Sequence, residues 1–189
     1  RVESHPMPAQ ISGVSRAMFD TIAPEMGGIN RVLLSNLWLF EPLVRSQLVK
    51  AGDTNAILRT TTAPTMLEAG NKENVLPGQA QATINFRLLP GDRIDDVITH
   101  VRRVVDDPDV TVTARPGASE ATRVSSSDSA GYRLLARTLR ELSPGMVVAP
   151  GLMIGGTDSK HFDALAQSVF KFMPVRAGPD DLARFHGTN

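Results

Sequence analysis

The sequence contains no cysteine among its 189 residues. Disulfide bonds and thiolate metal sites are therefore excluded, and any transition metal must be held by histidine and carboxylate side chains. An excess of charge of one sign is also missing, because 20 Lys and Arg residues are matched by 20 Asp and Glu residues. A chain without net charge has no global attraction to nucleic acid or to an anionic membrane, so neither is expected as a partner.

A long uninterrupted apolar run is missing as well. The most apolar stretch, residues 29–50, contains Arg31 and Glu41 and is interrupted by Pro42. Because charges are costly in hydrocarbon, this stretch is interpreted as a broken, largely buried helix pair and not as a membrane span. Residues 1–10 lack the apolar centre of a signal peptide. A soluble protein is expected, with the cytoplasm as one candidate compartment that the sequence does not single out.

The periodicity of the remaining apolar residues predicts an α+β protein. Helical spacing predicts a helix over residues 12–23, and β-branched residues predict an extended segment over 57–67. Residues 80–88 alternate between apolar and polar side chains, as a half-buried strand does, while 94–105 carry the apolar stripe of a helix. Alternation over 110–114 predicts a further strand. This order favours an open-faced sandwich, in which helices cover one face of a sheet.

The last third of the chain begins with a segment rich in Gly, Ala and Ser, residues 115–128, which is interpreted as a linker between domains. A capped helix with Ala136 on its inner face is expected next. Short apolar runs at 146–149 and 168–172 predict strands, and 179–185 predict a final helix.

The first candidate site pairs Asn74, in a loop, with Arg87, on the polar face of the strand expected over residues 80–88. Arginine offers a planar fork of N–H donors that matches both oxygens of a carboxylate. An asparagine amide in the preceding loop can reach the same ligand or stabilise an oxyanion. The ordinary alternative is a surface arginine beside a turn asparagine, since exposed arginines are common.

The second candidate is a glycine loop, Gly155-Gly156-Thr157-Asp158, between an apolar run and a helical pattern. Glycines before a helix let backbone amides approach an anion, and Thr157 or Asp158 can cap the helix. The spacing is not that of a phosphate-binding loop or a dinucleotide fingerprint, so nucleotide binding is not supported. A tight turn followed by a capped helix explains the same residues.

The third candidate is His186, which is followed by Gly-Thr-Asn. Neutral imidazole is the usual nitrogen ligand of zinc, but a zinc site requires three or more protein ligands. The other histidines show no ligand spacing. His100 is interpreted as a surface residue of the 94–105 helix, and His161 as a residue that packs or hydrogen-bonds behind the glycine loop.

Taken in order, these motifs resemble those of the zinc peptidases and deacylases that include aminoacylase, acetylornithine deacetylase, glutamate carboxypeptidase and carboxypeptidase S. Residues 70–77 with 80–87 resemble the dimerisation-domain signature of that family. Residues 155–162 resemble its glycine loop, and 184–189 resemble the segment that carries its last zinc ligand. The run 60–65 and the apolar helical insertion are most similar to the carboxypeptidase S or Gly-X carboxypeptidase branch.

The resemblance implies an α+β fold in two parts. Residues 1–116 would form a ferredoxin-like lid or dimerisation domain, an antiparallel sheet with helices on one face. This domain would lack its first strand and carry an apolar helical insertion near 29–50. Residues 117–189 would form the C-terminal part of an α/β zinc-peptidase catalytic domain.

The resemblance also implies a chemistry, the hydrolysis of an amide bond next to a free carboxylate by a carboxypeptidase or N-acyl amino acid amidohydrolase. Two zinc ions would activate a water molecule in the full-length enzyme, with His186 as one ligand and a glutamate as general base. Asn74 and Arg87 would contact the substrate, with Arg87 on its carboxylate in the same protomer or its dimer partner. The backbone of residues 155–158 would line the pocket. The implied partners are a small-molecule or peptide substrate and a second copy bound through the lid.

Part of the family pattern is absent from this sequence. Missing are the first zinc-binding histidine, the bridging aspartate, the catalytic glutamates, and the first lid strand with the histidine that follows it. The chain also begins with Arg1 and stops at Asn189 directly after a helical pattern, as a fragment would. We therefore expect the chain alone to bind zinc incompletely or not at all and to be inactive, and we assign no catalytic residue.

Two alternatives stay open. One is a non-catalytic dimerisation or interaction module, and the other is a ligand-binding α+β domain of the regulatory type, which would use the same fold. A regulatory ligand-binding domain does not account for the motif His186-Gly-Thr-Asn at the end of the sequence. Metal analysis and amide hydrolysis, compared between the chain and the longer protein, separate an enzyme part from an interaction module.

Overall fold

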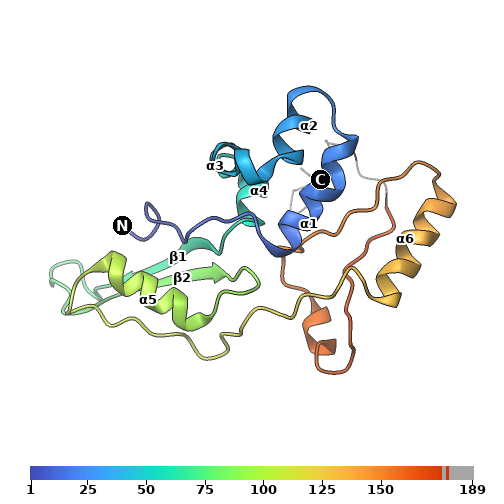
Figure 1. Cartoon of the computed structure of the whole chain (residues 1–189). Helices are drawn as coiled ribbons and strands as arrows, with labels where there is room; N and C mark the ends of the chain where they lie inside the picture. The colour runs from blue at the N-terminus through green and yellow to red at the C-terminus, as the bar shows by residue number, and fades with distance from the viewer. Residues whose placement is uncertain (176–177, 179–189) are drawn as a thin grey trace.

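The computed structural model describes residues 1–175 and residue 178, and the helix expected over 179–185 lies outside them. In chain order the elements are α1 (Gly13–Ile22), the 3₁₀ turn η1 (Ala23–Glu25), α2 (Gly28–Ser35), α3 (Leu37–Leu48), α4 (Gly52–Ala56), β1 (Thr61–Ala69), β2 (Ala80–Arg87), α5 (Ile94–Val105), α6 (Ala130–Leu142) and the 3₁₀ turn η2 (Asp158–Phe162). Helices α1–α4 lie together, the two strands lie with α5, and α6 stands apart among irregular chain (Figure 1). The expected α+β class is confirmed.

Helices α1–α4 enclose one apolar core. Leu37, at the start of α3, and Leu58, after α4, are both 0% exposed. The predicted helix pair is present as α2 and α3, and Asn36 breaks it because its backbone leaves the helical region (φ −122°, ψ 43°). The expectation of a largely buried pair is wrong for one side, where Trp38 is 78% exposed. Among the described residues, the buried positions of this pair are limited to Leu34, Leu37 and Val44, which belong to the core.

The sheet is an antiparallel hairpin of two strands, β1 and β2. Thr61 pairs with Arg87 at one end and Ala69 with Ala80 at the other. The register shifts between Pro64 and Met66. Proline cannot donate a ladder hydrogen bond, which agrees with the irregularity at this point. The strand predicted over residues 80–88 from its alternating pattern is present as β2, so this prediction is confirmed.

Helix α5 covers one face of this hairpin and forms the second apolar core. Met7, Val97 and Val101 are buried, and Phe86 and Leu88 from the strand side pack against them. The amphipathic stripe of α5 thus meets the apolar positions at the end of β2. The described residues thus contain a two-stranded antiparallel sheet with one covering helix.

A buried threonine connects the start of β1 with the turn after β2. Thr60 is 0% exposed and lies directly before β1. Its hydroxyl donates to the Asp92 carboxylate at 2.6 Å and accepts the backbone N–H of Leu89 at 2.8 Å. The entrance of β1 is therefore held against the turn that follows β2.

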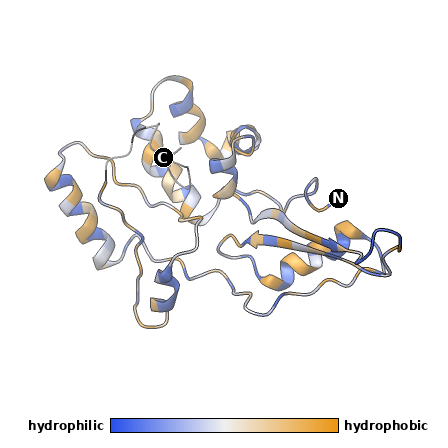
Figure 2. Ribbon diagram, turned by 180° about the vertical axis from the view of Figure 1, so that it is seen from behind, coloured by the Kyte–Doolittle hydropathy of each residue, from blue (hydrophilic) through white to orange (hydrophobic). Residues whose placement is uncertain are grey.

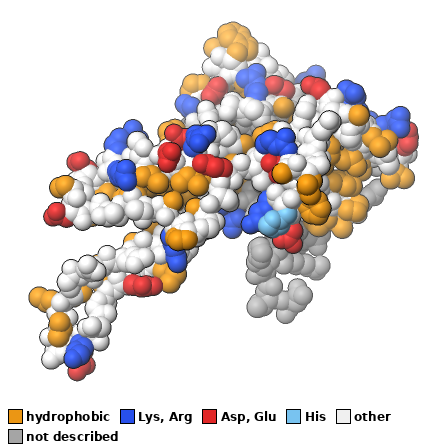
Figure 3. Space-filling model, turned by 90° about the horizontal axis from the view of Figure 1, so that it is seen from below, with side chains coloured by type: hydrophobic (Ala, Val, Ile, Leu, Met, Phe, Trp, Pro, Cys, Tyr) orange, Lys and Arg blue, Asp and Glu red, His pale blue; other side chains and the backbone are white. Residues whose placement is uncertain are grey.

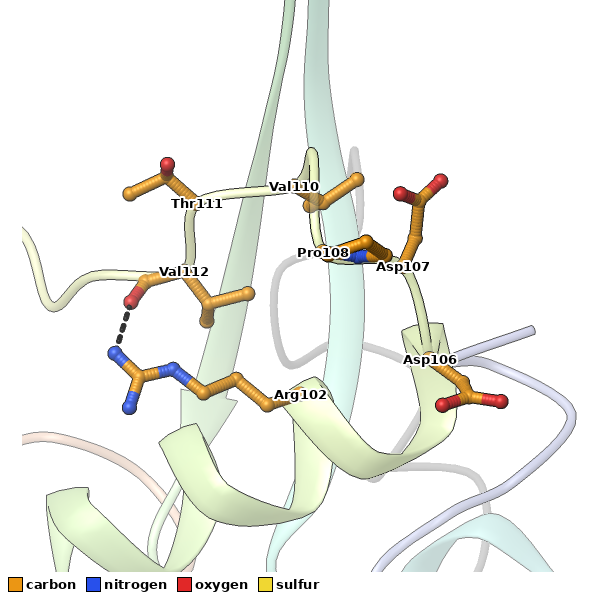
Figure 4. A pocket seen from close by; sticks show the side chains of 7 residues that line it. All are labelled: Arg102, Asp106, Asp107, Pro108, Val110, Thr111 and Val112. Atoms are coloured by element: carbon orange, nitrogen blue, oxygen red, sulfur yellow. Dashed lines mark hydrogen bonds between the residues drawn. The ribbon is translucent and has the colours of Figure 1, made fainter.

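The strand expected over residues 110–114 is not formed. The Arg102 guanidinium of α5 donates to the carbonyl of Val112 at 3.0 Å (Figure 4). A helix side chain thus satisfies a backbone group that a sheet partner would otherwise take. Val112 packs against the core beneath α5, whereas Val110 is 46% exposed.

The strands expected at 146–149 and 168–172 are also absent from the part of the chain that the structure describes. At Val169 the reason is visible, because one serine side chain replaces a neighbouring strand. The Ser125 hydroxyl donates to the Val169 carbonyl at 3.0 Å and accepts the Val169 N–H at 2.8 Å.

Helix α6 has the predicted amphipathic character, with Ala136 buried. Its first turn is capped by the Ser129 side chain, which accepts the Tyr132 N–H at 3.2 Å. The Tyr132 ring lies 6.0 Å from that of Phe170, measured between ring centroids. A Cβ on Gly131 would lie 3.0 Å from the Phe170 ring, so glycine permits this close approach.

The chain exposes 13970 Å², whereas a compact monomer of 20.4 kDa would expose about 8,800 Å². Hydrophobic side chains accordingly gather at the surface among charged ones (Figure 3). Within the described residues, no helix is both long and apolar enough to cross a membrane. Polar residues interrupt the apolar ones along the helices (Figure 2).

Candidate substrate-binding site

Arg87 is the last residue of β2 and its side chain is exposed, as the alternating pattern predicts. Its Nη1 donates to the carbonyl of Ile154 at 3.5 Å, a long hydrogen bond across 67 positions of sequence. Guanidinium carries five N–H donors, so nearly the whole fork stays available to a ligand. Ile154 directly precedes the glycine loop, which places that loop beside Arg87.

The glycine loop is open to solvent. Gly155 is half-buried, and Gly156, Thr157 and Asp158 are exposed. Thr157 occupies the N-cap position of η2, yet its side chain makes no capping hydrogen bond and lies 2.5 Å from the Ser159 hydroxyl instead. The helix expected after the loop is a short 3₁₀ turn.

An arginine from the linker holds the chain that follows this loop. Arg123 Nε donates to the Asp163 carboxylate at 3.2 Å, and its Nη2 donates to the carbonyls of Asp163 and Ala166. Nothing in the sequence pattern singles out Arg123, because it lies 40 positions from Asp163. The sequence reasoning missed this support of the loop. His161, expected to lie behind the loop, is exposed.

Asn74 lies elsewhere. It is exposed in the turn that joins β1 to β2, whereas Arg87 ends β2 at the opposite end of the hairpin. Seven residue steps from Ala80 to Arg87 at about 3.3 Å each separate the two ends by about 23 Å. The structure therefore brings Arg87 and the glycine loop together within one chain and keeps Asn74 apart from both.

Zinc ligands are not assembled among residues 1–175 and 178. No group of three or more His, Cys, Asp or Glu side chains there could hold a metal ion. His186 lies outside the described residues. The described donor set thus does not fit a zinc site, and no catalytic step through zinc follows from it.

His100 has a structural role, and its interpretation as a surface residue is wrong. It is 7% exposed because the N-terminal segment packs over α5. Its Nε2 lies 2.7 Å from the carbonyl of His5, and its Nδ1 lies 3.1 Å from Nη2 of Arg103. Arginine only donates, so Nδ1 accepts and Nε2 carries the proton that is donated to His5.

Two surface hollows lie away from Arg87 and the glycine loop. One is formed by the C-terminal half of α5 and the segment after it, including Arg102, Pro108 and Val112 (Figure 4). The other is lined by the N-terminal segment and α5, including His5 and His100. Neither contains a residue of the candidate site.

Burial shifts the pKa values of two residues outside this site, Arg59 and Tyr132. Burial lowers the pKa of Arg59, and the nearby charge of Arg45 lowers it further. Burial raises the pKa of Tyr132, an effect that Arg140 opposes.

Residues 16–113 match the family described as peptidase dimerisation domain. This range runs from α1 past α5 and includes the hairpin that carries Arg87. The chain belongs to this family, the M20 family of zinc peptidases, and the resemblance drawn from the sequence motifs is confirmed.

Similar proteins carry two kinds of name. "Probable carboxypeptidase S-like 2" of Dictyostelium discoideum is 41% identical over 99% of this chain and 36% of its own length. "N-fatty-acyl-amino acid synthase/hydrolase PM20D1" is 38% identical in Xenopus tropicalis and 39% in Homo sapiens, each over 100% of this chain. These matches cover 37% and 38% of the two relatives, so this chain spans about a third of their length. No solved structure matches the chain.

Proposed function

We propose that this chain is the lid and C-terminal catalytic segment of a zinc-dependent hydrolase that cleaves an amide bond next to a free carboxylate. Family membership supports hydrolysis, and the relatives' names support a carboxypeptidase or an N-acyl amino acid amidohydrolase. The observation that supports the proposal most is the hydrogen bond of 3.5 Å from Arg87 Nη1 to the carbonyl oxygen of Ile154, the residue before the glycine loop. Two segments far apart in sequence thereby form one carboxylate-binding corner.

In this proposal Arg87 binds the substrate carboxylate, and the backbone of residues 155–158 lines the pocket beside it. Asn74 would serve the site of a second copy, which its distance from Arg87 supports. Residues 1–116 would form the ferredoxin-like lid and 117–189 the end of the α/β catalytic domain. The match to a dimerisation domain supports a homodimer formed through the lid.

Zinc dependence enters through the family, with two ions per active site of the full-length enzyme and His186 as one ligand. The chain alone should bind little zinc and hydrolyse no amide, because a single histidine does not hold this metal. Metal analysis after dialysis against zinc tests this directly. Stoichiometric zinc bound by the 189-residue chain, or amide hydrolysis by it, would contradict this part of the proposal.

The test of Arg87 uses the longer protein that contains this chain. Arg87 is exposed in this chain, so the proposal requires the substrate and the rest of the longer protein to enclose it. Arg87→Ala should then lower kcat/KM for N-acyl amino acids by about 2–5 kcal/mol, roughly 30-fold or more, as expected for an enclosed charge pair. For the same substrates with the carboxylate converted to a carboxamide, Arg87→Ala should lower kcat/KM much less, because a carboxamide offers Arg87 no negative charge.

The matched control is Arg115→Ala. Arg115 is also exposed and also reaches the hairpin, donating to the Thr83 hydroxyl at 3.4 Å, but lies outside the proposed site. Its loss should leave kcat/KM nearly unchanged. Equal effects of the two substitutions, or equal losses for carboxylate and carboxamide substrates, would remove Arg87 from the site.

The alternative, a non-catalytic dimerisation module, is favoured by the same family match and by the small sheet. It predicts that the longer protein self-associates but hydrolyses neither dipeptides nor N-acyl amino acids. Measured turnover of either substrate class decides against it.

A further inference from the structure

The linker that precedes α6 is tied to two parts of the molecule at once. Glu120 accepts the first backbone N–H of α5 at 3.1 Å, a position where helices favour a negative charge. A few positions further on, Arg123 and Ser125 bind the chain that follows the glycine loop, between residues 163 and 169. We call residues 120–125 the brace, because they connect α5 with that chain.

The chain around the glycine loop has little other support. Residues 151–170 contain neither a strand nor an α-helix, and their backbone hydrogen bonds to one another are local. In the described part of the chain, three side chains from elsewhere form hydrogen bonds with this stretch, those of Arg87, Arg123 and Ser125. The bond from Arg87 is 3.5 Å long and therefore weak. The brace thus supplies the firmer attachments.

Arg123 is the member of the brace that lies nearest to the glycine loop. Its guanidinium binds the Asp163 carboxylate and the carbonyls of Asp163 and Ala166, directly after η2, whereas Ser125 binds Val169 further along the chain. Contacts from one planar group to three oxygens fix the direction of the chain at this point. The side chains are 62% exposed for Arg123 and 29% for Asp163, so the ion pair adds at most about 1 kcal/mol to global stability. The effect of Arg123 is therefore local.

We propose that Arg123 is a positioning residue, which holds the glycine loop beside Arg87 without contacting the substrate. The brace is bound to α5 at Glu120, and α5 packs on the hairpin that carries Arg87. A brace attached on both sides sets the distance between the loop and the Arg87 guanidinium. This inference rests on the proposed function in one respect, the binding of the substrate carboxylate by Arg87 and residues 155–158.

Two other roles explain the contacts of Arg123 less well. An ordinary surface ion pair would engage the Asp163 carboxylate alone, whereas Nη2 also donates to two backbone carbonyls. Direct binding of the substrate would need a free fork, and both Nε and Nη2 of Arg123 are already engaged. Arg87 uses Nη1 alone in the described structure, so it remains the better carboxylate ligand.

The first test measures turnover by the longer protein that contains this chain. A misplacement of 1 Å can cost on the order of 100-fold, and Ser125 still supports the chain, so Arg123→Ala should raise KM for N-acyl amino acids by about tenfold. With kcat nearly unchanged, this is the signature of lost binding. KM for the corresponding carboxamides should change little. Partial unfolding would instead lower kcat for both substrate classes and leave KM unchanged.

The matched control is Arg133→Ala. Arg133 is also exposed and also donates to a backbone carbonyl, that of Asp128 at 2.5 Å, but this bond stays within its own stretch of chain. Its loss should leave KM unchanged. Arg123→Lys keeps the charge but cannot bridge the carboxylate and the carbonyls at once, so it should restore only part of the lost binding. In an Arg87→Ala background, Arg123→Ala should change KM much less than in the parent, because the two residues act on one ligand.

The second test follows hydrogen–deuterium exchange of the longer protein without substrate, so it does not depend on hydrolysis. The backbone N–H groups of Lys160, Asp163 and Ala166 form local hydrogen bonds in and after η2. These amides should exchange at least several-fold faster in Arg123→Ala than in the parent or in Arg133→Ala. Amides in the middle of α5 should exchange at the parent rate in all three proteins.

Three results would overturn the proposal. One is unchanged exchange of these amides in Arg123→Ala. A second is an equal rise of KM in Arg123→Ala and Arg133→Ala. The third is a raised KM without faster exchange, which would place Arg123 on the substrate itself. If Arg87→Ala left kcat/KM unchanged, the proposed function would fail instead, and the exchange rates would still decide whether Arg123 positions the loop.

Discussion

The two parts of this chain enclose very different amounts of apolar surface. Residues 1–105 contain the two apolar cores, around Leu37 and around Val101. Among residues 117–175, Ala136 alone is buried, while Leu165 is 81% and Leu142 is 77% exposed. Amphipathic sequence is present in both parts, so periodicity by itself does not make a core. A core forms where a second element lies opposite, as α5 lies on the hairpin.

The largest expected effect separates the two parts directly. Leu37→Ala should lower the free energy of unfolding by about 2–5 kcal/mol, because the removed methyl groups leave a cavity that the helices cannot close. Leu165→Ala, at a position 81% exposed, should change it by less than about 0.5 kcal/mol. Urea denaturation followed by circular dichroism measures both. Similar losses for the two variants would break the comparison.

A smaller effect tests how, in the first part, the start of β1 is held against the turn after β2. Thr60→Val keeps the shape of the side chain but removes both hydrogen bonds, leaving the Leu89 N–H without its partner at 2.8 Å. A buried unsatisfied donor costs about 1–3 kcal/mol of unfolding free energy. Thr62→Val, at a half-buried position of β1, is the control, with an expected change below about 0.5 kcal/mol. If the two variants were equally stable, the hydrogen bonds of Thr60 would not stabilise this connection.

The smallest effect concerns a packed contact of the second part, that of Tyr132 with Phe170. Burial raises the pKa of Tyr132 above its ordinary value of 10.0, with Arg140 acting in the opposite direction. The neutral phenol therefore stabilises the fold fully below the unfolded pKa, and this contribution is lost as pH rises through the folded pKa.

Tyr132 is the single tyrosine of the chain, so phenolate absorbance reports it alone. Its titration midpoint should lie higher in the folded chain than in urea, and Tyr132→Phe should remove the corresponding alkaline loss of stability. Identical midpoints would show that even this contact is open to water, and the contrast between the two parts would become sharper.

Local pattern predicted the elements wherever a residue's environment follows from its neighbours in sequence. The two-residue period around Ile84 identified β2, and helical spacing identified α1, α5 and α6. The β-branched residues over 57–67 identified most of β1. Each of these depends on backbone geometry over a few residues.

Prediction failed where a distant residue took over a backbone group or covered a side chain. Arg102 binds the carbonyl of Val112 in the segment 110–114, which does not join the sheet. Ser125 binds both backbone groups of Val169 in place of a strand. The N-terminal segment covers His100, which the helical pattern placed at the surface.

The candidate site shows the same division. The residue types of Arg87 and of the glycine loop indicated carboxylate binding, and their motifs indicated the family. Their contact across 67 positions was not readable from the sequence. The separation of Asn74 from Arg87 follows from the register of the hairpin, with Ala80 at one end and Arg87 at the other.

The sequence by itself determined the class of fold, the positions of most helices, the hairpin strands and the family, because short-range periodicity and motif order are written along the chain. Only the tertiary structure decided which apolar faces are enclosed, which backbone groups are satisfied by side chains, and that Arg87 lies beside the glycine loop. Those outcomes depend on contacts between residues tens of positions apart, whose free energies arise only when the chain has folded.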